Sequence, residues 1–553
     1  MDISTALRFL RLIWGFCLVL AFGAWLLASC SGERPSAPAT VIIASERPYA
    51  ERALELGAAL LAPHGLDVVA AVPGDEPHIT VGQQVDAGSA PFVTGYWAIA
   101  VAWSSPVWGH DMATLAEALQ GDGDTSQVLV PVERAPPVRE WWPEIGPLTA
   151  TLPLADIAGA LEADANAIAL LPLDAVGAEI RVVPVAGFDI VFGEALFGDG
   201  DVETYPLVER AWVSAAAHES PDFALLLQQT KRALAERLAL DFLPPDPIIL
   251  RATGDIIPAR CVYAKQRDYS DFAHAFRELG PWLSEADITV GSLDASISDA
   301  GRPFGCTPTF SLLAPAQSVE GLAYAGFDVV TVATNHVKDC GQDSCGDQAF
   351  FDTLSILRSN GIEPVGGGRD LAEARRPAIL EVRGITFAFL GADQIATYYH
   401  AAEGVPGVAP LTEAFLREDV AAAAVLADVV VVLPQWGVEY TNHPTASQQT
   451  LAAAAAEAGA DLVIGNHPHW VQAVDVIGET YVAYALGNFV FDQDWSVPTQ
   501  QGVVLEAAFH GADLKGVRLH PIRIIDQHQP TFPSVHEASE ILGRIWAASA
   551  ALR

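Results

Sequence analysis

Residues 248–260, IILRATGDIIPAR, hold a short apolar run that is followed by Gly254-Asp255. The run begins directly after a proline cluster, DFLPPDP at residues 241–247, and a short apolar run bounded in this way is typical of a buried strand. Open α/β sheets build their sites at the carboxyl ends of their strands. This stretch therefore predicts the first strand of an α/β domain, with Asp255 at the edge where a site forms.

Similar apolar runs continue to about residue 525 and alternate with amphipathic segments. They are ITVGSL (288–293), DVVTVAT (328–334), AILEV (378–382), ITFAFLG (385–391), DVVVVL (428–433), DLVIG (461–465) and YVAYAL (481–486). This alternation predicts a layered α/β fold.

Side chains of metal-ligating types follow several of these runs. They are Asp294 after residues 288–293, Asn335 and His336 after residues 328–334, and His467 and His469 after residues 461–465. One such residue alone is explained as a turn or helix cap, or as a surface histidine. Recurrence at four strand ends, counting Asp255, instead favours a site. The mixture of carboxylate, amide and imidazole is typical of a centre that binds two divalent cations.

The strings GDIIPAR, SLD, ATNH, QWGVEY, IGNHPHWVQ and YALGNFVFDQ occur here in the order of the CapA family. That family is the poly-gamma-glutamate capsule-synthesis branch of the calcineurin-like metallophosphoesterases, and the resemblance covers essentially all of residues 248–525. It implies a calcineurin-like layered fold, which we place at residues 248–530, followed by a tail helix at 531–553. It also implies one or two divalent metal ions, among which Mn, Fe, Zn and Mg are not distinguished.

The resemblance assigns roles to individual residues. It implies metal ligands at Asp255, Asp294, Asn335, Gln435, His467 and His469, and a proton donor for the leaving group at His336. Two ligands depart from the family pattern, because Gln435 stands where a histidine is usual and Asp294 replaces a glutamate. A glutamine carbonyl can coordinate a metal, but it is a poorer ligand than imidazole for a borderline transition metal. Arg260 is a candidate catalytic residue that clamps an anionic substrate, and the alternative is an ordinary surface ion pair.

The chain has six cysteines, of which Cys261, Cys306, Cys340 and Cys345 lie downstream of the N-terminal apolar segment. Cys340 and Cys345 bracket the short loop CGQDSC, so the least demanding pairing joins them and leaves Cys261 to Cys306. A zinc cluster is the alternative, but the spacing is not of the CxxC type. We therefore predict two disulfides, as expected of an exported protein.

The N-terminus predicts export. Arg8 and Arg11 precede the apolar run LIWGFCLVLAFGAWLLAS, and a polar stretch follows Cys30. Leu27 to Cys30, LASC, reads as a lipobox, so residues 1–30 are predicted to be a lipoprotein signal peptide, with Cys30 lipidated, and residues 31–40 a linker. A retained transmembrane anchor is the alternative. Either predicts an extracytoplasmic protein that is anchored to the membrane.

Upstream of the proline cluster we place an α/β domain at residues 41–240. VIIAS, an amphipathic run at 49–61 and LDVVAAV predict a strand-helix-strand unit. The segments at residues 96–121 and 166–187 resemble the return strands of periplasmic solute-binding proteins, particularly the phosphate-binding type. The resemblance implies a small ligand for this domain, and a spacer or docking module is the alternative.

Composition limits the function. Lys and Arg number 30 against 68 Asp and Glu, a formal net charge of −38, which argues against binding to a nucleic-acid backbone. An acidic capsule polymer would be repelled too, unless a metal or a local basic patch attracts it. We expect a metal-dependent hydrolase that acts on an anionic capsule polymer or a phosphoester. The alternatives are a non-catalytic binding or assembly lipoprotein, and a first domain that senses a ligand and regulates the second.

Overall fold

The computed structural model describes residues 40–46, 48–83, 88–103, 105, 112–119, 127–134, 136, 141, 151–195, 202 and 205–552. The predicted signal peptide with Cys30, and the linker up to residue 39, lie outside the described residues. Two compact units are present, one formed by Met1–Val93 with Arg210–Phe242 and the other by Thr94–Glu209 with Leu243–Arg553. Within the described residues, no helix is both long enough and apolar enough to cross a membrane.

The first unit contains the predicted strand-helix-strand pattern. Its elements are β1 (Thr40–Ser45), α2 (Ala50–Leu61), β2 (Asp67–Ala70), β3 (Ile79–Gly82), β11 (Val208–Ala215) and α6 (Pro221–Leu240). Strand β1 pairs in parallel with β2 and β3, and β11 adds to β3 in antiparallel orientation. Val41 and Ile43 alternate with more exposed neighbours on β1 and are buried in a core that also includes residues of both helices.

The remaining part of the predicted first domain belongs to the second unit. Its elements are β4 (Ala90–Val101), α3 (Met112–Leu119), β5 (Val128–Pro131), β6 (Thr151–Leu152), α5 (Leu154–Ala163), β7 (Ile168–Pro172), β8 (Arg181–Val183), β9 (Phe188–Asp189) and β10 (Glu194–Ala195). Strand β4 pairs in antiparallel orientation with β7 and β8, while β5 pairs in parallel with β7 and β6. The chain passes from one compact unit to the other after Val93, after Glu209 and after Phe242, and the last of these points lies within the predicted linker at residues 241–247.

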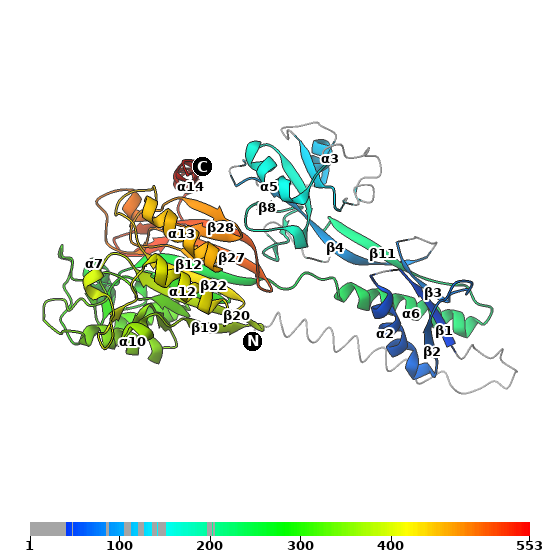
Figure 1. The fold of residues 1–553 in the computed structure, drawn as a ribbon, viewed down its shortest axis with the longest axis horizontal. Helices are drawn as coiled ribbons and strands as arrows, with labels where there is room; N and C mark the ends of the chain where they lie inside the picture. The colour runs from blue at the N-terminus through cyan, green and yellow to red at the C-terminus, as the bar shows by residue number, and fades with distance from the viewer. Residues whose placement is uncertain are drawn as a thin grey trace. The chain divides into compact units, whose positions relative to one another are not determined.

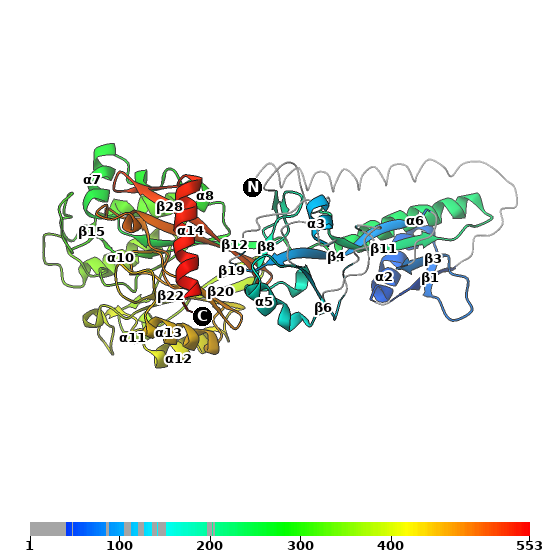
Figure 2. The same cartoon turned by 90° about the horizontal axis from the view of Figure 1, so that it is seen from above.

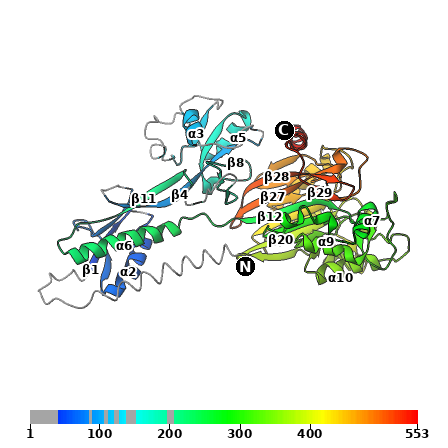
Figure 3. The ribbon, with the colours of Figure 1, turned by 180° about the vertical axis from the view of Figure 1, so that it is seen from behind.

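Residues 248–531 form two large sheets (Figures 1 and 3). The first runs in the order β17 (Glu363–Val365), β16 (Val329–Thr331), β13 (Ile288–Leu293), β12 (Ile248–Ile256), β27 (Gln501–His510), β28 (Asp513–Ile525), β29 (Gln529–Thr531), and β26 (Asn488–Val490) pairs with β12. The second runs in the order β19 (Ala378–Val382), β20 (Ile385–Asp393), β22 (Val429–Gln435), β23 (Leu462–Ile464), β25 (Thr480–Ala483), β24 (Val474–Ile477). The layered α/β fold predicted for this region is confirmed.

Alternation along β22 shows how the layers are packed. Val429, Val431 and Leu433 belong to a core shared with Leu250 of β12 and other residues of the first sheet. Their neighbours on the strand, such as Val430, face the opposite side. There they pack with residues of α12 (Glu413–Ala423) and α13 (Ala446–Ala458). The core on the other side of the first sheet includes residues of α9 (Val319–Tyr324) and α10 (Gln348–Ser359).

The predicted tail helix is present as α14 (Val535–Ala550), which packs against β24 and β28 (Figure 2). Ile541 and Ile545 place their side chains in the core between the two sheets. Ser534 caps the helix by accepting a hydrogen bond from the backbone N–H of Glu537.

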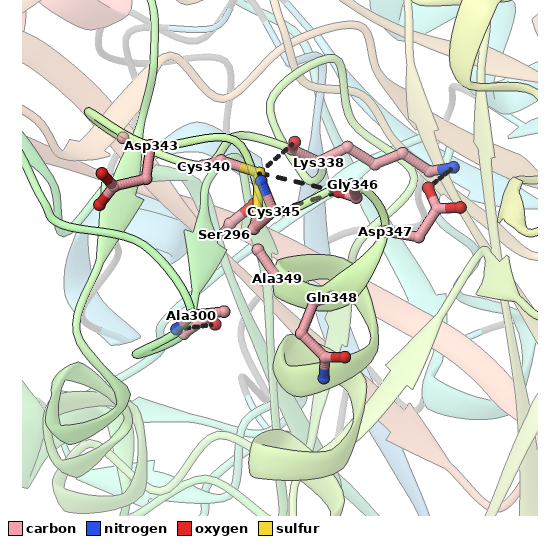
Figure 4. Close-up of a disulfide and its surroundings, with 12 residues drawn as sticks. Ser296, Ala300, Lys338, Cys340, Asp343, Cys345, Gly346, Asp347, Gln348 and Ala349 are labelled. Atoms are coloured by element: carbon pink, nitrogen blue, oxygen red, sulfur yellow. Dashed lines mark hydrogen bonds and ion pairs between the residues drawn. A yellow bond between two sulfur atoms is a disulfide. The ribbon is translucent and has the colours of Figure 1, made fainter.

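Both predicted disulfides are present, Cys261–Cys306 and Cys340–Cys345. The second disulfide lies in the loop between β16 and α10 (Figure 4). In the same loop, Lys338 Nζ lies 2.8 Å from Asp347 Oδ1, just before α10 begins. The cysteines are therefore joined in pairs and do not form a zinc cluster.

Candidate functional site

The first sheet contributes two carboxylates to a single edge. Asp255 is the last residue but one of β12, and it pairs with Ser292 of β13 and with Asn488 of β26. Asp294 follows β13 directly, and its backbone N–H donates to the carbonyl of Ile256 at 3.1 Å. Both aspartates are fully buried.

Gly254 directly precedes Asp255 in β12, and the surrounding backbone requires a glycine there. A Cβ atom at this position would lie 1.9 Å from the carbonyl oxygen of Gly487, which precedes β26. Any side chain would therefore push β26 away, and with it Asn488, whose Oδ1 lies 2.9 Å from Nδ1 of His469.

The second sheet contributes at its own carboxyl edge. Gln435 ends β22 and is paired with Asp393, the last residue of β20. His467 and His469 follow β23 and have positive φ angles of 95° and 58°. This backbone conformation is rare for residues other than glycine, and it occurs preferentially at functional sites.

Contacts between side chains join the two edges into one site. Gln435 Nε2 donates to Asn335 Oδ1 at 3.1 Å. The backbone N–H of His467 donates to Asp255 Oδ2 at 3.3 Å, and His469 Nδ1 lies 3.2 Å from the same oxygen. The structure thus brings together the residues that the sequence analysis proposed as ligands.

The site contains an unusual concentration of buried polar atoms that have no hydrogen-bond partner. They are Asp255 Oδ1, both carboxylate oxygens of Asp294, Asp393 Oδ1, Gln435 Oε1, Asn466 Oδ1 and His467 Nδ1. A buried acceptor without a partner costs about 1–3 kcal/mol, so native proteins contain few of them. Acceptors gathered at one point fit a bound cation.

The ligand types also fit a hard or borderline divalent cation, because they combine carboxylate, amide and imidazole groups. Among the residues that the structure describes, no three His, Cys, Asp or Glu side chains come close enough together to hold a metal ion. A metal ion at this site would therefore also need the amide oxygens of Asn335 and Gln435 as ligands.

Charges within the site shift the ionisation of its members. Burial, together with the negative charge of Asp255, raises the pKa of Asp294 to about 6. Burial and the neighbouring His469 lower the pKa of His467 to about 3, which favours its neutral form. Burial also disfavours the charged form of His469, but its hydrogen bond with Asp255 and that carboxylate's charge outweigh this effect and raise its pKa.

His336 is oriented by a carboxylate that the sequence analysis missed. Its Nδ1 lies 2.8 Å from Asp339 Oδ2, which also accepts a hydrogen bond from the backbone N–H of Leu312. Burial lowers the pKa of His336, but the charges of Asp294 and Asp339 more than compensate and raise it. The spacing His-x-x-Asp was the available signal, because a tight turn after Asn335 brings such a pair together.

Asp393 was also missed, although its signal is the one that identified the other residues. The apolar run ITFAFLG is followed by Ala392 and then Asp393, which ends β20. Asp393 Oδ2 accepts from the backbone N–H of Ala396 at 2.7 Å and lies 3.4 Å from His400 Nε2, while Oδ1 has no partner.

Arg260 forms an ion pair with Asp492, as the alternative to a substrate clamp predicts, but the pair is largely buried and does not lie on the surface. Only 14% of the Arg260 side chain and 4% of the Asp492 side chain are exposed. Arg260 Nη1 also donates to the carbonyl of Thr309 at 2.8 Å, and the backbone N–H of Cys261 donates to Asp492 Oδ2. The disulfide at Cys261 thus begins next to this ion pair.

Comparison with known proteins identifies the region that carries the site. Residues 249–493 match the family described as bacterial capsule synthesis protein PGA_cap. This region is a PGA_cap domain. It contains all the residues proposed above as ligands, together with His336, Arg260 and both disulfides.

Two relatives are at least 30% identical to this chain. The PGA biosynthesis protein CapA of Bacillus subtilis is 32% identical over 245 residues, which are 44% of this chain and 63% of the relative. The capsule biosynthesis protein CapA of Bacillus anthracis is 30% identical over 258 residues, which are 45% of this chain and 61% of the relative. The chain thus spans less than two thirds of the length of each of these relatives. The predicted membership of the CapA family is confirmed for the PGA_cap domain.

Solved structures resemble this chain only distantly. The NAD nucleotidase of Haemophilus influenzae has a TM-score of 0.31 at 11% identity and covers 54% of this chain and 62% of its own. An ABC-type phosphate transport receptor from Vibrio cholerae has a TM-score of 0.22 at 12% identity and covers 35% of this chain and 97% of its own. At these scores the likeness carries no argument about function.

Proposed function

We propose that the protein is an extracytoplasmic, membrane-anchored factor of capsule or cell-envelope polymer metabolism, of the poly-gamma-glutamate type, and that it acts as a metal-dependent hydrolase. The observation that carries this proposal is the group of buried acceptor atoms without partners where the two sheets meet. Membership of the PGA_cap family supports the assignment to capsule metabolism.

The ligands of one or two divalent ions would come from both sheets. Asp255 lies in the first sheet, and Asp294 and Asn335 follow strands of that sheet; Gln435 lies in the second sheet, and His467 and His469 follow its strand β23. A bound ion would neutralise the charge that develops on an oxyanion and lower the pKa of a coordinated water. Asp393 and Asn466 have free acceptor oxygens at the same edge and are additional candidate ligands.

His336 would donate a proton to the leaving group from Nε2, since Nδ1 is engaged by Asp339. This contact fixes the orientation of the ring, and the adjacent carboxylates favour its protonated form. Arg260 would contact an anionic substrate with the part of its guanidinium that Asp492 and Thr309 leave accessible. Because Asp492 balances its charge, we expect Arg260 to position the substrate more than to attract it.

The experiment is metal analysis of the purified protein, followed by hydrolysis assays on a phosphodiester and on poly-gamma-glutamate, each with and without a chelator. We expect bound metal and chelator-sensitive hydrolysis of one of the two substrates. Asp255→Asn should abolish both, whereas Asp268→Asn, at an exposed aspartate outside the site, should change neither. A folded wild-type protein that binds no divalent ion would overturn the proposal.

One specific observation favours a second function, a non-catalytic binding or assembly role. Gln435 stands where the resemblance to the CapA family places a histidine, and an amide oxygen is a poorer ligand than imidazole for a borderline metal ion. A protein that retains one metal ion but cleaves neither substrate would support this alternative.

The proposed anchor is the lipid on Cys30, which lies outside the described residues. Replacing Cys30 by serine should release the protein from the membrane fraction, because a lipid chain is the proposed attachment. Continued tight membrane association of Cys30→Ser would support an uncleaved helix instead.

A further inference from the structure

Three neighbouring strands of the second sheet end side by side at the edge that carries the candidate metal centre. Asp393 is the last residue of β20, Gln435 is the last residue of β22, and Asn466 follows β23. Asp393 pairs in parallel with Gln435, and Gln435 forms a parallel bridge with Asn466. Residues that pair across parallel strands point to the same face of the sheet, about 4.8 Å apart, so the three side chains form one row.

Each residue of this row, which we call the oxygen row, is buried and has an oxygen atom without a hydrogen-bond partner. Asp393 and Gln435 are 0% exposed, and Asn466 is 2% exposed. The three atoms are Asp393 Oδ1, Gln435 Oε1 and Asn466 Oδ1. A buried acceptor without a partner is costly and rare, so three in adjacent positions indicate that they share a positively charged partner.

Contacts at the other end of each polar group hold two of these oxygens in place. Asp393 Oδ2 accepts a hydrogen bond from the backbone N–H of Ala396 at 2.7 Å and lies 3.4 Å from His400 Nε2. Gln435 Nε2 donates to Asn335 Oδ1 at 3.1 Å. Hydrogen bonds of this kind orient the side chains that bind metal ions in proteins. The oxygen row is therefore arranged as a set of ligands is.

The free atoms of the oxygen row are one carboxylate oxygen and two amide oxygens. Carboxylates, amide carbonyls and water are the usual ligands of Ca²⁺, whereas Zn²⁺ binds preferentially to imidazole and thiolate. The imidazoles of the candidate metal centre belong to His467 and His469, which follow the oxygen row in the chain. The ligand types thus divide between a position for a hard cation and a position for a borderline one.

We propose that Asp393, Gln435 and Asn466 form an all-oxygen site for a hard divalent cation, Ca²⁺, and that His467 and His469 serve a borderline cation. The inference rests on the proposed function, because it divides the ligands of the proposed metal centre between two positions. It also accounts for Gln435, since an amide oxygen suits a hard cation better than imidazole does. Asp393 supplies the single negative charge of the row, so we expect a dissociation constant of about 10⁻⁴–10⁻³ M, as in extracellular calcium modules.

The test is calorimetric titration of the purified protein with Ca²⁺ after one equivalent of Zn²⁺ has been bound. We expect wild type to bind one further equivalent, of Ca²⁺. Asp393→Asn keeps the shape of the side chain but removes its charge, so Ca²⁺ affinity should fall by about tenfold or more while Zn²⁺ binding is retained. Asp370→Asn is the matched control and should bind both ions as wild type does. Asp370 also accepts a hydrogen bond from a backbone N–H three residues later, that of Glu373 at 2.9 Å, but it lies outside the oxygen row.

Asn466→Asp tests the site in the opposite direction. It adds a second carboxylate to the oxygen row, so Ca²⁺ affinity should rise by about tenfold or more, and Ca²⁺ should raise the Tm of this variant more than that of wild type. Three results would overturn the inference and leave the proposed metal centre intact: wild type that binds Zn²⁺ but no Ca²⁺ at millimolar concentration, undiminished Ca²⁺ binding by folded Asp393→Asn, or unchanged Ca²⁺ affinity of folded Asn466→Asp. A folded wild type that binds neither ion contradicts the proposed function as well.

Discussion

Gln435 is fully buried, and its two amide atoms have different surroundings. Nε2 donates to Asn335, whereas Oε1 has no hydrogen-bond partner. A histidine in its place would offer a ring nitrogen, which binds borderline divalent cations better than an amide oxygen does. We therefore expect Gln435 to determine how tightly the proposed site binds a second ion.

We predict that Gln435→His raises the affinity for the more weakly bound ion by about tenfold or more, the size of typical ligand and outer-shell effects. Metal titration of both proteins measures this directly. Gln449→His, on the exposed side of α13, is the control and should bind metal as wild type does. If wild type already binds two ions tightly and the histidine changes nothing, Gln435 is not a ligand.

The sequence predicts most of the candidate site because each residue follows an apolar run that is recognisable alone. Asp255, Asp294 and His467 were identified in this way. Asp393 follows the same rule but was not identified, since no family string contained it. The partner of Arg260 could not be predicted, because Asp492 lies 232 positions away and only the folded sheet brings them together.

Three neighbouring strands share a buried ionic network that is centred on Glu506 of β27. Its carboxylate lies 2.8 Å from Arg251 Nη2 of β12 and 2.9 Å from His520 Nε2 of β28, and Arg518 is also within reach. Burial alone would raise the pKa of Glu506, but His520 and the two arginines outweigh it and lower the pKa from 4.5 to about 2.

A lowered pKa means that Glu506 stabilises the fold above pH 4.5, and that this stabilisation is lost as the pH falls towards 2. We predict that Glu506→Gln reduces the free energy of unfolding at pH 7 by about 3–5 kcal/mol, because the cations are left without their buried partner. Between pH 4.5 and 2, the free energy of unfolding of the variant should also fall less steeply than that of wild type, because the contribution of Glu506 is absent.

Denaturant unfolding of wild type and Glu506→Gln, at pH 7 and between pH 4.5 and 2, measures the loss of stability and its dependence on pH. Glu413→Gln removes an exposed i,i+4 ion pair with Arg417 and should cost less than about 1 kcal/mol at any pH. Equal effects of the two substitutions would contradict the assignment of Glu506 to a buried network.

The two disulfides close loops of very different length, with sequence separations of 45 and 5 residues. In the chain-entropy account, the longer loop contributes about 4 kcal/mol and the shorter one about 2 kcal/mol. We predict that Cys261→Ala/Cys306→Ala destabilises the protein more than Cys340→Ala/Cys345→Ala does. Thermal unfolding of the two double variants ranks them, and the reverse order would show that loop length does not determine the effect.

The organisation of the whole chain was predictable only in part. The apolar runs were sufficient to predict the two-sheet domain, because strand period and burial are local properties of the sequence. The assignment of residues 94–209 to the same compact unit as the C-terminal segment was not predictable, since it depends on side-chain complementarity between distant elements. Gly516 is an example, because a glycine in a strand does not indicate which distant residue packs against it.

Gly516 of β28 allows close approach of Val191 in the loop between β9 and β10. A Cβ atom on Gly516 would lie 2.8 Å from Val191 Cγ1, closer than real Cβ contacts allow. We predict that Gly516→Val destabilises the protein by about 1–3 kcal/mol, the usual cost of overpacking. Gly305→Val is the matched control, because a Cβ there meets no atom within 4 Å.

A double-mutant cycle attributes this cost to the packing of the two segments. Val191→Ala removes the clashing methyl group, so the double variant Val191→Ala/Gly516→Val should be more stable than the sum of the single effects predicts. Residues in direct contact typically show an interaction energy of about 0.5–3 kcal/mol, whereas distant residues are additive. Denaturant unfolding of the four proteins measures it. Strict additivity would mean that Val191 and Gly516 are not in contact in solution, and that the segment between β9 and β10 is not packed on β28.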